Sequence, residues 1–229
     1  MDVQTIMRTL NVISQSLVSV INRVDIKNVL TELEKNVINI QPDIIILSYC
    51  SRYVLSELNN KEWCKYYHMS VTGNTSLPRT HIVLSRYPIL RSESFGSPLV
   101  HIVETKIPFN DIPIRYEYED VAVQMVDMDT ITVIVTSDSE QSSEQHISNV
   151  SNIVAKICTQ PHTVLLVGTS GKGPLRSNSG IQWVDADESS QSSGQSTLCS
   201  TMCYTSEAWQ LRECTERVNN YSFELVCLE

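Results

Sequence analysis

The sequence predicts one α/β domain. Two segments, residues 1–47 and residues 130–167, each have the pattern of a strand, an amphipathic helix and a second, buried strand. Shorter stretches rich in β-branched residues lie between them and are separated by prolines, as expected of antiparallel strands. Strands that alternate with helices in this way form a sheet with helices packed against it.

The first segment opens with strand-like residues 1–12 and a link rich in Ser and Asn. A helix is expected to begin near Asp25. Its apolar side chains recur at helical spacing, at Ile26, Val29, Leu30, Leu33, Val37 and Ile40. Gln41 and Pro42 end this helix, because the residue before a proline avoids helical dihedral angles. Residues 43–47 include three consecutive isoleucines and are typical of a strand buried on both faces.

The second segment begins with a strand at residues 130–136, which contain only Thr, Ile and Val. Ser142 and Gln145 have the spacing of a capping box at the start of a helix that continues to Ile157. Residues 163–167 then supply another buried strand. Further strands are expected at residues 80–84, 100–105, 121–126 and 222–228.

The chain carries no sign of a domain boundary. It has no repeat of fixed period and no linker long enough to divide it, so residues 1–229 are expected to form a single domain. Residues 188–196 contain no apolar side chain and are expected to form a mobile surface loop.

The charge balance argues against a broad nucleic-acid surface. The sequence has 17 Lys and Arg against 26 Asp and Glu, a net charge of −9, and no run of three basic residues. Binding to phosphates by charge alone needs clustered cations. The longest strongly apolar run, residues 44–47, is far shorter than the roughly 20 residues of a membrane-spanning helix. Without a basic leader before a long apolar run, and with seven scattered cysteines, we expect an intracellular protein, cytoplasmic or nuclear, without membrane contact.

Three motifs resemble those of the endonuclease/exonuclease/phosphatase superfamily. Residues 9–12 (TLNV) are similar to that family's first strand, which ends in an Asn, and residues 41–47 (QPDIIIL) to its second strand. Residues 81–89 (HIVLSRYPI) are similar to the segment in which a strand ends in Ser-Arg-Tyr-Pro-Ile. The resemblance covers nearly the whole chain. It implies a DNase I-like four-layer sandwich, in which two packed mixed β-sheets are flanked by helices.

The same resemblance implies where the family's metal ligand and first catalytic histidine would stand. The Glu that follows the second strand falls at Tyr49, and a neutral phenol is a poor substitute for a carboxylate ligand of Mg²⁺. The His falls at Asp138. Asn11 is the one position of the family's site that matches.

The C-terminal part of the family's site is also replaced. The family's Gly-Asp-x-Asn motif falls at residues 168–171, where Thr169 stands for the Asp and Gly171 for the Asn. The closing Asp and His fall at Asn220 and Tyr221. Metal binding, activation of the nucleophile and orientation of the phosphate would therefore all be lost.

We interpret the sequence as that of a pseudoenzyme that binds no cofactor or metal. We expect it to act as a protein-interaction or structural subunit of an intracellular complex. A protein partner is favoured, and nucleic acid is the less favoured alternative. A different function remains open, in which Asp138, Asp185 and Asp187 rebuild an acidic site for a divergent Mg²⁺-dependent phosphodiesterase or nuclease. An acidic, solvated loop is the favoured interpretation of those aspartates.

Two groups of residues have an ordinary structural interpretation. Trp63, Tyr66 and Tyr67 could stack on bases, but packing is favoured for aromatic side chains beside a cysteine. The five histidines have no common spacing, and each is expected at a strand end or on the surface.

Overall fold

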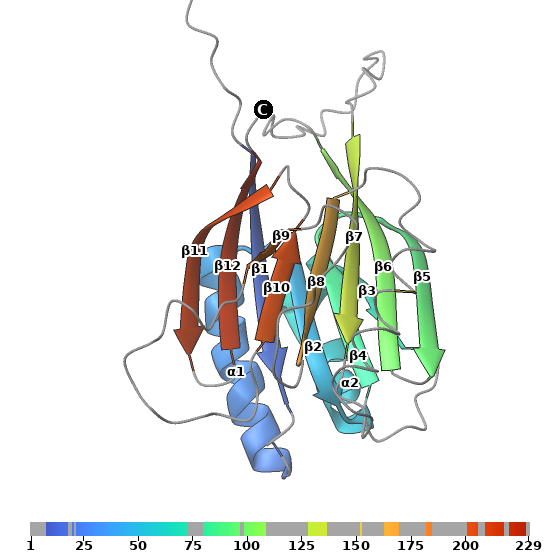
Figure 1. Cartoon of the computed structure of the whole chain (residues 1–229). Helices are drawn as coiled ribbons and strands as arrows, with labels where there is room; N and C mark the ends of the chain where they lie inside the picture. The colour runs from blue at the N-terminus through green and yellow to red at the C-terminus, as the bar shows by residue number, and fades with distance from the viewer. Residues whose placement is uncertain are drawn as a thin grey trace, which may run out of the picture.

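Two β-sheets pack face to face, and helices cover the outer face of the first sheet (Figure 1). The computed structural model describes residues 8–17, 20, 22–72, 80–96, 99–108, 128–136, 152, 163–169, 182–184, 201–205, 209–217 and 220–227. Within these residues each sheet has six strands. The α/β class and the two packed mixed sheets are therefore confirmed.

The first sheet combines both ends of the described chain. Its strands are β1 (Arg8–Ser16), β2 (Ile44–Cys50), β3 (His68–Val71), β4 (Thr80–Ser85), β11 (Trp209–Arg217) and β12 (Asn220–Cys227). They lie in the order β11-β12-β1-β2-β4-β3. Strands β1 and β2 are parallel, and the other neighbours are antiparallel.

The second sheet is built from the middle of the chain. Its strands are β5 (Ile89–Gly96), β6 (Leu99–Pro108), β7 (Met128–Thr136), β8 (Thr163–Thr169), β9 (Gln182–Val184) and β10 (Thr201–Thr205). They lie in the order β5-β6-β7-β8-β10-β9, and β7 and β8 are its parallel pair. Each sheet therefore contains one of the two strand pairs predicted to flank a helix.

The first strand extends further along the chain than predicted. Residues 1–12 were expected, whereas β1 ends at Ser16, and residues 1–7 lie outside the described part. Ser14, Gln15 and Ser16 are buried. Their backbone is paired with β2 on one side, and that of Ser14 and Gln15 also with β12 on the other. Pairing in the sheet satisfies the backbone of these residues, but their polar side chains give no strand signal in the sequence.

Helix α1 (Arg23–Ile40) begins two residues before the expected start. The Asn22 side chain caps it by accepting a hydrogen bond from the Asp25 backbone N–H at 2.8 Å. At the other end Gln41 adopts a left-handed conformation with φ of 50°, and its N–H donates to the Val37 carbonyl. The predicted apolar stripe packs on the sheet, except that Val29 is only partly buried and Ile40 is exposed.

Two shorter helical segments follow β2: α2 (Arg52–Asn59) and the 3₁₀-helix η1 (Glu62–Tyr66). Together with α1 they cover the outer face of the first sheet. One core cluster joins Leu30 and Leu33 of α1 and Leu58 of α2 to Leu47 and Leu84 of the sheet. None of the described helices is long and apolar enough to cross a bilayer.

The remaining strand predictions divide into confirmed and untested ones. Strands occur at the predicted residues 80–84, 100–105, 130–136 and 163–167, and β12 covers most of 222–228. The expected strand at residues 121–126 and loop at 188–196 lie outside the described residues. The expected helix at 142–157 does too, apart from residue 152, which is helical.

Contacts between β4 and β6 fix how the two sheets are oriented. The rings of His81 and His101 stack at a centroid distance of 6.5 Å, and Ser85 Oγ lies 2.9 Å from Thr105 Oγ1. Strands β4 and β6 therefore run in the same direction. Because β2 is antiparallel to β4 and β7 is antiparallel to β6, β2 and β7 also run together, pointing downward in Figure 1. The strands β1, β2, β7 and β8 thus end at the same side of the sandwich, here called the C-terminal edge.

Leu84→Ala should destabilise the protein by about 2 to 5 kcal/mol, because it leaves a cavity in the cluster under the helices. Val24→Ala, on the exposed side of α1, should change stability by no more than about 0.5 kcal/mol. Urea unfolding followed by circular dichroism measures both. Equal effects of the two substitutions would contradict the assigned core.

Candidate functional site

The C-terminal edge collects polar residues from both sheets. Ser16 pairs with Ser48 at the ends of β1 and β2, and Thr136 pairs with Gly168 at the ends of β7 and β8. The ends of parallel strands at which connections diverge are a common place for ligand sites in α/β proteins. No Asp or Glu occurs in the last three residues of any of these four strands.

Tyr49, the residue predicted at the metal-ligand position, lies at this edge with an unusual backbone. Its φ is 60°, and the pairing of β2 with β4 shifts register between Leu47 and Cys50. A bulky residue rarely adopts positive φ, and such conformations concentrate at bulges and functional sites. Its side chain is half-buried. Tyr49 therefore has the positive φ and the bulge that are common at functional sites, but its side chain is a phenol and not a carboxylate.

Asn11, the residue predicted to match the family's site, does not lie at this edge. Its backbone N–H donates to the Asp43 carboxylate at 2.9 Å, and its carbonyl accepts from the Asp43 N–H at 2.8 Å. Asp43 immediately precedes β2, whereas Tyr49 lies near its end, roughly 20 Å away at about 3.3 Å per residue. Ser16 is the β1 residue that pairs beside Ser48. The polar run from Ser14 to Ser16 had suggested an early strand end, which misplaced the register.

A pair of buried histidines lies just inside the edge, between the sheets. Neither His81 nor His101 is exposed to solvent, although His81 is the second residue of β4 and so lies at a strand end, as expected. His101 Nε2 lies 2.8 Å from Ser70 Oγ and 3.2 Å from Ser92 Oγ. Neither ring nitrogen of His81 has a hydrogen-bond partner in the described part of the protein, and the same is true of His101 Nδ1.

Burial keeps both histidines neutral. Removal from water, together with a smaller effect of the neighbouring His101, lowers the pKa of His81 to about 3. Burial also lowers the pKa of His101 to about 4. Protonating either ring would bury a charge without a carboxylate partner among the described residues, and burying an unpaired charge costs several kcal/mol. The pair therefore adds polar atoms to the edge but no charge near pH 7.

The described residues do not form a metal site. They contain no group of three His, Cys, Asp or Glu side chains close enough to hold an ion.

Comparison with solved structures identifies the fold. A protein of the endonuclease/exonuclease/phosphatase family from Bacteroides vulgatus aligns with a TM-score of 0.65 at 10% identity, over 97% of this chain and 100% of that chain. The TDP2 of D. rerio, solved with a single-strand DNA product, aligns with a TM-score of 0.63 at 10% identity, over 96% and 98%. The human Nocturnin catalytic domain with a bound sulfate anion aligns with a TM-score of 0.60 at 11% identity, over 97% of both chains.

The chain has the endonuclease/exonuclease/phosphatase fold. No protein-family model matches the sequence, and no curated protein matches it. At these identities the likeness extends to the fold, so the chemistry has to be derived from the residues at the C-terminal edge.

The register places some of the other predicted site residues at this edge. Asn220 pairs with Gln15 and Tyr221 with Ser14, so the backbone at both positions lies beside the end of β1. Thr169 ends β8. Tyr221 also pairs with Glu216 of β11, an acidic residue near this edge that the sequence analysis did not consider. Asp138, Gly171, Asp185 and Asp187 lie outside the described residues.

The buried histidines predict that acid destabilises the protein. In the unfolded chain both have a pKa near 6.5, and in the folded protein about 3 and 4, so below about pH 6.5 the unfolded chain binds more protons. The stability that depends on these neutral histidines is therefore fully present above about pH 6.5, and it is lost progressively as the pH falls toward the folded-state pKa values of about 4 and 3. Urea unfolding at about pH 7 and about pH 5 measures the loss.

His81→Leu should reduce this loss, because it removes one buried titrating ring. At pH 7 it should be close to neutral, since the two nitrogens of His81 have no partner to lose. His68→Leu, at an exposed histidine, is the matched control and should keep the pH dependence of the wild type. A pH dependence of His81→Leu as steep as that of the wild type would contradict the assignment.

Proposed function

We propose that the protein does not catalyse phosphoryl transfer and acts as a protein-interaction or structural subunit of an intracellular complex. The observation that carries this proposal is Tyr49, which stands at the end of β2 where the resemblance requires a carboxylate ligand. The strands β1, β2, β7 and β8 supply no carboxylate at their ends to replace it.

The missing groups act together in metal-dependent phosphoryl transfer. Mg²⁺ prefers carboxylate and other oxygen ligands, and a neutral phenol binds it weakly. Buried neutral histidines with lowered pKa values are poor bases near pH 7. The position of Asn11 supports the same proposal, because the one residue that matches the family's site lies at the opposite end of β1. The proposed loss of activity therefore rests on three missing groups: a metal ligand, a general base and a group that orients the phosphate.

The acidic composition favours a protein partner over a nucleic acid. The D. rerio TDP2 structure contains a single-strand DNA product. In this chain 26 acidic residues outnumber 17 basic ones, so an extended nucleic-acid strand would meet a field of its own sign. A protein surface can be bound through local complementarity in spite of that net charge.

One observation favours the alternative of a divergent Mg²⁺-dependent phosphodiesterase or nuclease. Strand β9 is antiparallel to β10, which is antiparallel to β8, so β9 and β7 both run toward the C-terminal edge. They end at Thr136 and Val184, shortly before Asp138 and Asp185 in the sequence. A rebuilt acidic site would require those aspartates, with Asp187, to converge at that edge.

The purified full chain should not hydrolyse DNA, RNA or phosphoinositides above background in the presence of Mg²⁺ or Mn²⁺, because the groups for metal binding and proton transfer are missing. Product release from labelled substrates measures this. The decisive variant combines Asp138→Ala, Asp185→Ala and Asp187→Ala.

A triple variant with Glu32→Ala, Glu57→Ala and Glu62→Ala is the control, since it removes the same charge from the helical side of the first sheet. Cleavage by the wild type and this control, but not by the aspartate variant, would replace the proposal with the divergent enzyme.

Mg²⁺ or Mn²⁺ should also leave the thermal midpoint of unfolding unchanged within error, because a ligand stabilises the folded state only as far as it binds it. Differential scanning calorimetry with millimolar metal measures this. A saturable rise of several degrees at micromolar metal would contradict the absence of a site.

A further inference from the structure

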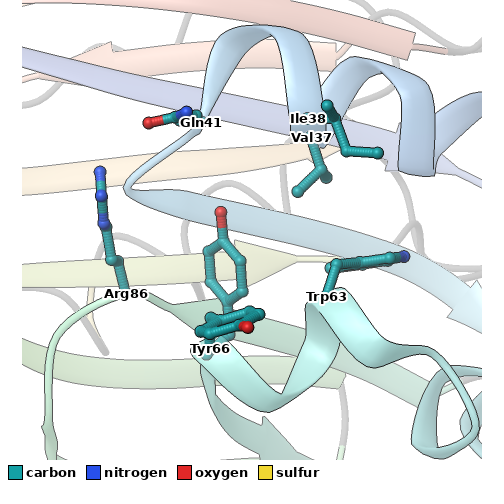
Figure 2. Close-up of a pocket in the computed structure, with 7 residues that line it drawn as sticks. Val37, Ile38, Gln41, Trp63, Tyr66 and Arg86 are labelled. Carbon is teal, nitrogen blue, oxygen red and sulfur yellow. The ribbon is translucent and has the colours of Figure 1, made fainter.

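A hollow of about 560 Å³ lies on the helical side of the first sheet, away from the C-terminal edge (Figure 2). It is here called the outer hollow. Its lining comes from the end of α1, from η1 with the residue after it, and from the residue after β4: Val37, Ile38, Gln41, Trp63, Tyr66, Tyr67 and Arg86. This volume is within the range of about 300 to 1,000 Å³ typical of ligand sites.

The outer hollow lies at the opposite end of the first sheet from the candidate site. Arg86 directly follows Ser85, which pairs with Ile44 at the start of β2, and the Arg86 N–H donates to the Asp43 carbonyl at 2.8 Å. The C-terminal edge begins at the other end of β2. An occupant of the outer hollow would therefore not reach Tyr49 or the histidine pair.

The floor of the outer hollow is held in place before any ligand binds. Trp63 is buried and meets the ring of Tyr67 edge to face at 6.0 Å. The Tyr67 hydroxyl donates to the Pro42 carbonyl at 2.8 Å. Lys61 and Glu34, paired at 2.8 Å, tie η1 to α1. A binding surface that is already ordered loses little entropy on association.

The lining is apolar on one side and polar on the other. Figure 2 shows Val37, Ile38 and Trp63 together on one side and Gln41 with Arg86 on the opposite side. Ile38 and Tyr66 are large side chains left 62% and 79% exposed. Exposed apolar side chains are ordinary when scattered, but here two of them line one preformed hollow.

Arg86 supplies a cation for a ligand. Its side chain is exposed, and no ion pair joins it to another residue in the described part of the chain. A guanidinium presents a planar set of donors that matches a carboxylate. Tyrosine, tryptophan and arginine are also the side chains that contribute most at protein interfaces.

We propose that the outer hollow binds an extended segment of a partner protein that inserts one large apolar side chain beside Ile38 and Tyr66 and places an Asp or Glu carboxylate on Arg86. This inference rests on the proposed interaction function and gives it a surface. A sphere of 560 Å³ is about 10 Å across, and an extended chain covers about 3.3 Å per residue. The apolar and acidic residues should therefore be within about three positions of each other. A second copy of the chain is disfavoured as occupant, because each copy carries a net charge of −9.

The test is selection from a displayed library of random dodecapeptides on the immobilised full chain. Selection on the wild type should enrich peptides with a large apolar residue near Asp or Glu. Selection on Arg86→Glu should enrich Lys or Arg at the acidic position, because the charge that recognises it has been reversed. Tyr66→Ala, at an exposed side chain, should weaken an enriched peptide by about tenfold in fluorescence polarisation.

Lys65→Glu is the matched control. It makes the same change of charge on η1 at a side chain that is 65% exposed and outside the lining, and it should select the same peptides as the wild type. The proposal is overturned if the wild type enriches no such motif, or if Arg86→Glu selects the same acidic peptides. A dimer in sedimentation velocity that dissociates in Tyr66→Ala would also overturn it, since the occupant would then be a second copy.

The peptide selection and the hydrolysis assay test the two proposals separately. Cleavage of nucleic acid by the wild type would overturn the proposed function whatever peptides are selected. Failure of the selection in a chain without hydrolysis would overturn the outer hollow alone.

Discussion

The contact between β4 and β6 is the interaction on which the rest of the arrangement depends. The hydrogen bond between Ser85 and Thr105 and the stacking of His81 on His101 require these two strands to run in the same direction. Each strand is antiparallel to a neighbour in its own sheet, so the two parallel pairs must end together. If the sheets packed in the opposite sense, the ends of β2 and β7 would be on opposite sides, and no shared edge would exist.

This contact uses polar side chains where a sheet sandwich usually packs aliphatic ones. Two hydroxyl groups satisfy one nitrogen of His101, whereas both nitrogens of His81 stay without a partner in the described part of the protein. The cost of such groups is about 1 to 3 kcal/mol each. Burial among aliphatic side chains keeps both imidazoles neutral beside the C-terminal edge.

The two ends of the first sheet therefore differ in chemistry. Among the side chains that the structure describes, the C-terminal edge presents hydroxyl, phenol and neutral imidazole groups. The opposite end, between α1 and η1, presents aromatic surface beside a guanidinium. A fold does not determine function. A site on the outer face can bind a partner whether or not the C-terminal edge is catalytically active.

The sequence by itself determined the α/β class, a helix from near Asp25 to Ile40 and the strands of both parallel pairs, because hydrophobic periodicity and the stop at Pro42 are local signals. It predicted β2 only as far as Leu47, whereas this strand continues through Tyr49 to Cys50. It could not show that Asn11 and Tyr49 lie at opposite ends of β1 and β2, because the register of these strands depends on pairing between distant segments and the polar residues 14–16 hide the end of β1. The burial of His81 and His101 was likewise decided only by tertiary structure. Each lies in a strand whose alternating side chains point to opposite faces of its sheet, and the sequence does not show which face is buried. Only the packing of one sheet on the other makes the face that carries the histidines part of the interior.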